Sequence, residues 1–197
     1  MDTGFEGDTL LLVGVVGSLR RDSYNRKLLR AARYLVPRGV SLDIWDGLGS
    51  VPPFNEDDEQ APAPAVVAMR HVFDQANAMI IATPQYNASL PGQLKNALDW
   101  ASRPYAENVL RGKPVAVIGA SQGPSGAARA HAEARAVLGA IGAEVVTANL
   151  SLGRVSMAFD DTGRLINTEH RAHLEEVLRQ AVRTARIRRA EPQANRA

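Results

Sequence analysis

The sequence contains no cysteine, and only four of its 197 residues are histidine. The absence of cysteine excludes disulfide bonds, thiolate nucleophiles, cysteine-ligated zinc, iron–sulfur clusters and dithiol redox chemistry. Any redox reaction must therefore depend on a bound cofactor. His71 and His131 lie in predicted helices with no carboxylate or second histidine at metal-ligand spacing. We predict no metal site.

Long apolar runs and a strong charge imbalance are also missing. No stretch reaches the roughly 18 consecutive apolar residues of a membrane-spanning helix, so no membrane partner is expected. Lys and Arg total 23 against 21 Asp and Glu, and this small excess does not indicate nucleic-acid binding. Residues 1–8 carry acids and no basic segment typical of a signal peptide, and we expect a flexible N-terminus and a cytoplasmic protein.

Apolar runs alternate with segments of helical periodicity from residue 9 onward, which is typical of βαβ units. Strands are predicted over Leu10–Val16, Ser41–Ile44, Ala78–Thr83, Lys113–Ala120 and Ala143–Thr147. Helices are predicted over Asn25–Val36, Ala65–Phe73, Pro91–Ser102, Ala127–Ile141 and Thr168–Arg189. Residues 46–64 are rich in proline and acids and predict a long loop. The pattern indicates one doubly wound α/β domain over residues 9–189, with a disordered tail at 190–197.

Ligands of such sheets bind beyond the C-terminal ends of the strands, so the loops after strands one, three and four are the candidate functional segments. The first reads G-S-L-R-R-D-S-Y-N from Gly17 and leads into a helix. Ser18, Ser23 and Asn25 offer neutral donors, Arg20 or Arg21 offers positive charge, and the helix N-terminus adds free N–H groups. This combination predicts a phosphate-binding loop. The simpler interpretation is that Ser23 only caps the helix.

The loop after the third strand reads T-P-Q-Y-N-A-S-L-P-G. Pro84 fixes its own backbone angle, Tyr86 offers a flat apolar face, and Asn87 can both donate and accept hydrogen bonds. Together with Gln85, these residues suit a planar heteroaromatic ring. A turn with Ser89 capping the next helix would also explain part of the pattern.

G-S-L-R-x-x-S-x-N followed by T-P-Q-Y-N-x-S-x-P-G-x-L-K-N-A-L-D-W closely resembles the NADPH-dependent FMN reductase family. That family includes quinone, chromate and azo-dye reductases with a flavodoxin-like fold. The resemblance implies a five-stranded parallel sheet in the order 2-1-3-4-5 with helices on both faces. It assigns the FMN phosphate to Ser18, Arg20, Ser23 and Asn25. It assigns the isoalloxazine ring to Pro84, Gln85, Tyr86 and Asn87.

The loop after strand four reads S-Q-G-P-S-G from Ser121, and the resemblance places Ser121, Gly123 and Gly126 beside the flavin ring. Two residues depart from the family pattern: Gln85 stands where glutamate is common, and Ala127 where a further glycine is usual. The resemblance implies that hydride passes from NAD(P)H to bound FMN and then to a small-molecule acceptor in a ping-pong cycle. Such a cycle needs no catalytic side chain. The family also implies a homodimer or homotetramer.

Two other functions compete with this interpretation. Residues Gly119 to Gly123 have the sequence G-A-S-Q-G. This sequence matches the G-x-S-x-G nucleophile elbow of serine hydrolases, with Ser121 as the nucleophile. The acid and histidine would come from a later pair, Asp160 or Asp161 and His170 or His173. A hydrolase leaves the first loop unexplained, and both histidines lie among surface charges. The third possibility is a flavodoxin-like carrier that binds FMN without being reduced by NAD(P)H; such carriers are typically acidic, unlike this chain.

Overall fold

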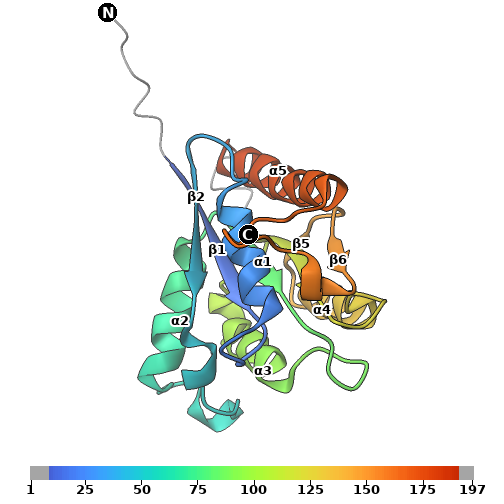
Figure 1. Cartoon of the computed structure of the whole chain (residues 1–197). Helices are drawn as coiled ribbons and strands as arrows, with labels where there is room; N and C mark the ends of the chain where they lie inside the picture. Colours follow the sequence, from blue (N-terminus) through green and yellow to red (C-terminus); the bar gives the residue numbers. More distant parts are fainter. Residues whose placement is uncertain (1–8, 191–197) are drawn as a thin grey trace, which may run out of the picture.

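Parallel strands form the centre of the computed structural model, which describes residues 9–190 (Figure 1). Their order is β2-β1-β3-β4-β5, with β6 also paired to β4, so the predicted flavodoxin-like order is confirmed. The strands are β1 (Leu10–Val16), β2 (Val40–Trp45), β3 (Ala78–Ala82), β4 (Pro114–Ala120), β5 (Glu144–Val145) and β6 (Leu150–Leu152). Residues 1–8, predicted to be flexible, and residues 191–197 of the predicted disordered tail lie outside the described residues, whereas Ala190, where that tail was predicted to begin, is the last residue of a helix.

Five α-helices of the described chain cover the two faces of this sheet. They are α1 (Tyr24–Arg33), α2 (Pro64–Gln75), α3 (Gly92–Ala101), α4 (Ala128–Ala140) and α5 (Thr168–Ala190). The proline-rich loop 46–64 contains two short 3₁₀ turns, η1 (Gly47–Ser50) and η2 (Glu56–Asp58). Helix α1 ends three residues earlier than predicted because the N–H groups of Tyr34 and Leu35 bond to carbonyls only three residues back.

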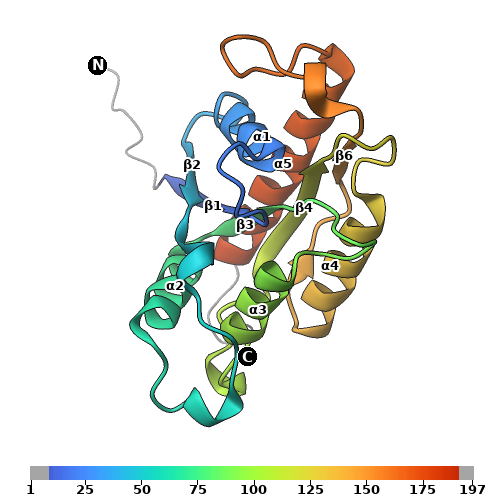
Figure 2. The same cartoon turned by 60° about the horizontal axis from the view of Figure 1, so that its bottom comes forward.

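Alternate residues of the central strands point to opposite faces, and each face has its own apolar core. Helices α1 and α5 pack on one core with Leu12, Ile80 and Ile118, whereas α2, α3 and α4 pack on the other with Val13 and Ile81. Figure 2 shows the two groups of helices on opposite sides of the sheet. Because β1, β3 and β4 are covered on both sides, their sequences read as unbroken apolar runs.

The predicted fifth strand, Ala143–Thr147, is shorter in the structure, where β5 covers only Glu144–Val145, and β6 (Leu150–Leu152) is a further strand that was not predicted. Strand β5 pairs with the beginning of β4, and β6 pairs with its end at Ile118 to Ala120. Between them, the N–H of Ala148 donates to the side-chain oxygen of Gln180 in α5, at 2.9 Å, instead of continuing the ladder. The chain therefore leaves the sheet and returns as β6, which lies beside the loop after β4.

The structure shows no helix within residues 9–190 that is long and apolar enough to cross a membrane.

Candidate functional site

The loop after β1 lies at the C-terminal edge of the sheet and is tied to the loop after β3. The hydroxyl groups of Ser18 and Tyr86 share a hydrogen bond of 3.1 Å, and Ser18 Oγ also accepts from the N–H of Arg20. Ser23 caps α1, its hydroxyl accepting from the N–H of Asn25 at 3.2 Å. Ser18 and Ser23 are buried, whereas Arg20 is exposed. The loop therefore combines two buried, hydrogen-bonded hydroxyl groups with one exposed cationic side chain.

Asn25 uses its side chain to connect α1 with the end of β4. Its amide nitrogen donates to the carbonyl of Ala120 at 3.1 Å, and its amide oxygen accepts from the N–H of Ala120 at 2.9 Å. Both groups of the buried amide are thus satisfied by the protein. Asn25 positions the first loop relative to the fourth, and a direct contact of its side chain with phosphate stays a prediction.

The loop after β3 forms a tight turn whose two ends are held by α4. Tyr86 and Ser89 exchange backbone hydrogen bonds around Asn87 and Ala88, which have positive φ angles of 50° and 67°. Before the turn, the side-chain oxygen of Gln85 accepts from the backbone N–H of Arg129. After it, Glu133 accepts from the N–H of Leu90.

Sequence reasoning gave Glu133 no role, because only the fold brings it to the loop after β3. The helix expected to start at Pro91 begins at Gly92, with Pro91 as its N-cap, so Ser89 closes the turn rather than capping α3.

The loop after β4 is shaped by β6. The N–H of Ser121 donates to the carbonyl of Leu152, and Ser121 Oγ accepts from the N–H of Gly123 at 3.1 Å. Gly126 has a positive φ of 59°, and a Cβ there would lie 2.6 Å from the backbone of Ser151. A Cβ on Gly123 would meet only Ser121 Oγ, at 3.6 Å. The fold explains the glycine at 126, whereas the space beside Gly123 is open to a ligand.

These three loops enclose one cavity of about 180 Å³. Its lining includes eight of the predicted residues: Ser18, Arg20, Ser23, Asn25, Pro84, Gln85, Tyr86 and Ser121. Asn87, Gly123 and Gly126 belong to the same loops but do not line this cavity. Tyr24, Ala120 and Gln122 also line it and were not predicted.

His131 lies beneath this site and is buried in α4. Its pKa is lowered to about 4, chiefly because burial destabilises the imidazolium; the nearby carbonyl of Thr83 opposes this effect, and the charge of Arg135 adds to it. The side chain is therefore neutral near pH 7. No cluster of histidines and carboxylates suited to a metal ion occurs between residues 9 and 190.

The fold and the site define a flavodoxin-like α/β protein with a mononucleotide-type cavity at the point where the strand order reverses. Sequence comparison specifies the family, since the profile of the NADPH-dependent FMN reductases matches residues 10–156. The chain belongs to the NADPH-dependent FMN reductase family. It is thus an oxidoreductase that uses FMN as cofactor and NAD(P)H as co-substrate.

Curated relatives and a solved structure agree with this placement. A 2-hydroxy-1,4-benzoquinone reductase of a Burkholderia species is 38% identical over 170 residues, 84% of this chain and 91% of that protein. An NAD(P)H-dependent FMN reductase of Pseudomonas aeruginosa is 39% identical over 173 residues, 87% of this chain and 92% of that protein. FerB, a flavoenzyme NAD(P)H:(acceptor) oxidoreductase from Paracoccus denitrificans, superposes with a TM-score of 0.83 at 30% identity, covering 90% of this chain and 98% of FerB.

The residues at the cavity fit FMN. A phosphate needs donors and positive charge, and the first loop supplies two hydroxyls, the exposed Arg20 and the beginning of α1. A flavin ring needs an apolar face and edge donors, and Tyr86 and the loop at Ser121 both line the cavity.

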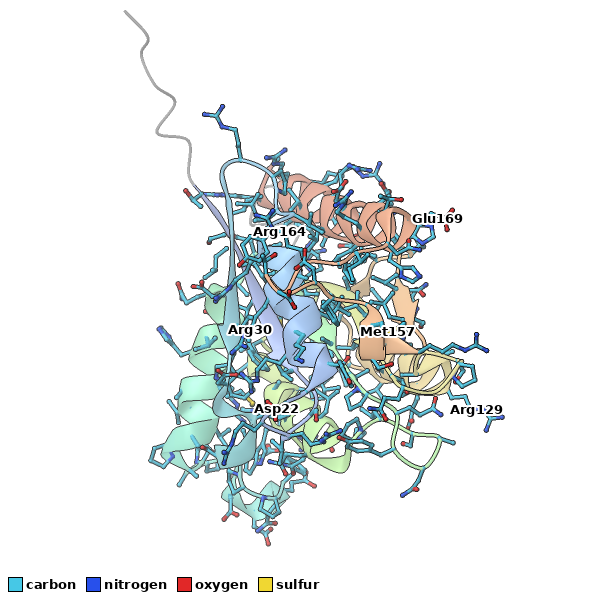
Figure 3. All side chains as sticks on the ribbon, in the orientation of Figure 1. Asp22, Arg30, Arg129, Met157, Arg164 and Glu169 are labelled. Atoms are coloured by element: carbon cyan, nitrogen blue, oxygen red, sulfur yellow. The ribbon has the colours of Figure 1, made fainter. Side chains whose placement is uncertain are left out.

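The serine hydrolase alternative gains no support from the structure. The Ser121 hydroxyl accepts from Gly123, and within the described chain none of its hydrogen bonds involves a histidine. Asp160 uses one carboxylate oxygen within its own turn, where hydrogen bonds from Thr162 and Arg164 lower its pKa. Figure 3 places Glu169, the neighbour of His170, well away from Arg129 at the beginning of α4.

Proposed function

We propose that this protein is an NAD(P)H:quinone oxidoreductase, in which hydride passes from NAD(P)H to FMN and then to a quinone, or to a chromate, azo or similar acceptor. The observation that carries the proposal is the Ser18–Tyr86 hydrogen bond, which joins the phosphate loop and the ring loop at one cavity. The relatives named as quinone reductases, 38–39% identical to this chain, support the acceptor class.

Each loop has a separate task in this proposal. Ser18, Ser23 and the N-terminus of α1 bind the phosphate through neutral donors, and Arg20 neutralises its charge. Asn25 keeps this loop in register with the end of β4. The phosphate site thereby anchors the cofactor at a fixed distance from the ring site.

The ring contacts come from the other two loops. Pro84, Gln85, Tyr86 and Asn87 contact one part of the ring, and Ser121, Gly123 and Gly126 shape the loop on the other. FMN supplies the two-electron chemistry when it is bound. The protein holds the ring, provides backbone N–H donors around it and keeps one face open for the nicotinamide and the acceptor in turn. No side chain has to transfer a proton, so we assign no catalytic acid, base or nucleophile.

The proposal includes the assembly and location expected from the sequence. A single FMN-binding domain over residues 9–189 would form a homodimer or homotetramer, as the family resemblance implies. NAD(P)H is an intracellular reductant, which supports a cytoplasmic location.

Steady-state kinetics test the proposal. Under anaerobic conditions, protein reconstituted with FMN should turn over NADH or NADPH continuously only when 1,4-benzoquinone is present, and double-reciprocal plots at several quinone concentrations should be parallel. Arg20→Gln should weaken FMN binding by about tenfold, as expected for a lost charge-assisted hydrogen bond. Arg183→Gln, which removes an exposed arginine of α5, is the matched control and should bind FMN as wild type does. Absence of quinone-dependent oxidation by the FMN-loaded protein would overturn the proposed function.

A further inference from the structure

His131 in α4 is a buried ionisable side chain that the reaction does not use, with 3% of its surface exposed. Its Nδ1 lies 2.7 Å from Ser151 Oγ in β6. Its Nε2 is also buried, and no group within residues 9–190 forms a hydrogen bond of normal geometry with it. A Cβ built on Gly119 would lie 2.3 Å from this Nε2 and 2.4 Å from the carbonyl oxygen of Thr83. The imidazole, strand β4 and the end of β3 therefore meet at one point.

The Thr83 carbonyl faces the imidazole because the ladder between β3 and β4 stops early. The last pair is Ala82 with Ile118, and the N–H of Thr83 still donates to the carbonyl of Ile118 at 3.0 Å. The next bond of a parallel ladder would run from the N–H of Ala120 to the carbonyl of Thr83. Asn25 takes that N–H instead, at 2.9 Å.

A neutral imidazole can complete this junction. With the proton on Nε2, its N–H points toward the Thr83 carbonyl while Nδ1 accepts from the Ser151 hydroxyl. The low pKa of His131 agrees with a neutral ring, since burial disfavours the imidazolium. The lack of a side chain at position 119 leaves the space that the imidazole occupies.

We propose that His131 is a positioning residue for the flavin ring. It sets the distance between the end of β3 and the end of β4, where the two loops that face the ring begin. Thr83 directly precedes Pro84, and Gly119 lies two residues before Ser121. The third contact, Ser151, belongs to the strand against which Gly126 packs. One side chain thus touches the bases of both ring loops and the strand behind the second.

The proposal rests on the proposed function only in assigning this cavity to FMN. It is tested with His131→Leu, which keeps an apolar side chain of similar size and removes both nitrogens, and with His131→Asn, whose amide can still reach Ser151. His131→Gln replaces the leucine variant if that variant does not fold. Leu138→Ala is the control, because Leu138 is fully buried in the same helix but lies seven residues further along it than His131.

Two readouts separate positioning from simple stability. In the FMN-free protein, hydrogen exchange at the backbone amides of residues 83–90 and 121–126 should be faster in His131→Leu, and unchanged in Leu138→Ala outside α4. In the FMN-loaded protein, His131→Leu should raise the dissociation constant of FMN by about tenfold, as for one lost buried hydrogen bond, and should shift the visible flavin band. His131→Asn should recover part of both effects.

The outcomes distinguish this proposal from the proposed function. If wild type binds FMN and reduces quinone, but His131→Leu retains wild-type exchange, FMN affinity and flavin spectrum, the positioning role is overturned and the function stands. If Leu138→Ala changes the FMN affinity as much as His131→Leu does, the effect is one of stability and the positioning role is again overturned. If wild type binds no FMN, both proposals fall.

Discussion

Ala88 is a strained residue in the turn that presents Tyr86, and its replacement by glycine should stabilise the protein. Its φ angle is +67°, in the left-handed region, and its side chain is exposed. A non-glycine residue in that region costs roughly 1–2 kcal/mol, whereas glycine adds about 0.5–1 kcal/mol of chain entropy to the cost of folding. The difference predicts that Ala88→Gly raises the free energy of unfolding by about 0.5–1 kcal/mol.

The same substitution at Ala127 should have almost no net effect. Ala127 also has a positive φ, +75°, but the residue is buried, with 1% of its surface exposed. Losing a buried methyl group costs about 0.8 kcal/mol, which offsets most of the strain released. Ala172→Gly, at an exposed position in the second turn of α5, is the control without strain and should cost about 1 kcal/mol.

Urea unfolding of the FMN-free protein measures these differences without a contribution from ligand binding. We expect the order Ala88→Gly, then wild type and Ala127→Gly together, then Ala172→Gly. For a chain of this size, a gain of 0.5–1 kcal/mol corresponds to roughly 1–4 °C in Tm. If Ala88→Gly is destabilised as much as Ala172→Gly, the turn is not strained and the reasoning is refuted.

Three further predictions follow from buried polar groups and from the glycines. The pKa of His131 is about 4 in the folded state, lower than in the unfolded state. The free energy of unfolding should therefore fall by up to about 3 kcal/mol as the pH drops from 6.5 to 4. This dependence on pH should be weaker in His131→Asn. Asn25→Ala leaves the N–H and carbonyl of Ala120 unpaired and should cost roughly 2–4 kcal/mol in urea unfolding; a cost below 1 kcal/mol would contradict the bridging role. Gly126→Ala should lower the free energy of unfolding by about 2–5 kcal/mol because of its positive φ and the contact with β6. Gly123→Ala should change the stability of the FMN-free protein by no more than about 0.5 kcal/mol, but it should weaken FMN binding in a titration. Equal losses of stability in the two glycine variants would contradict the contrast between them.

The strands at the centre of the sheet were predictable because burial on both faces leaves a direct mark on the sequence. The bounds of β1 agree with the prediction, and those of β3 and β4 differ from it by one residue. The fifth strand could not be predicted in the same way. Strand β5 ends at Val145, and before the unpredicted β6 begins the N–H of Ala148 donates to Gln180, a side chain more than 30 residues further along the chain. No local pattern records such a contact.

The candidate site was predictable at the level of loops but not of individual contacts. Ser18 and Tyr86 were assigned to separate parts of the ligand, and the structure shows that they also hydrogen-bond to each other. Asn25 has the residue type of a ligand-binding group, yet its side chain is satisfied by Ala120. His131 received no role, since a lone histidine in a helix is usually structural and only the fold brings Thr83 and Ser151 to it.

The central claim is that the cavity formed by Ser18, Tyr86 and Ser121 holds an FMN that NAD(P)H reduces and a quinone reoxidises. The most direct measurement is the visible absorbance of FMN-reconstituted protein under anaerobic conditions. Addition of NADH or NADPH should bleach the flavin band, and subsequent addition of 1,4-benzoquinone should restore it. A flavin band that stays unchanged after both nucleotides would contradict the account.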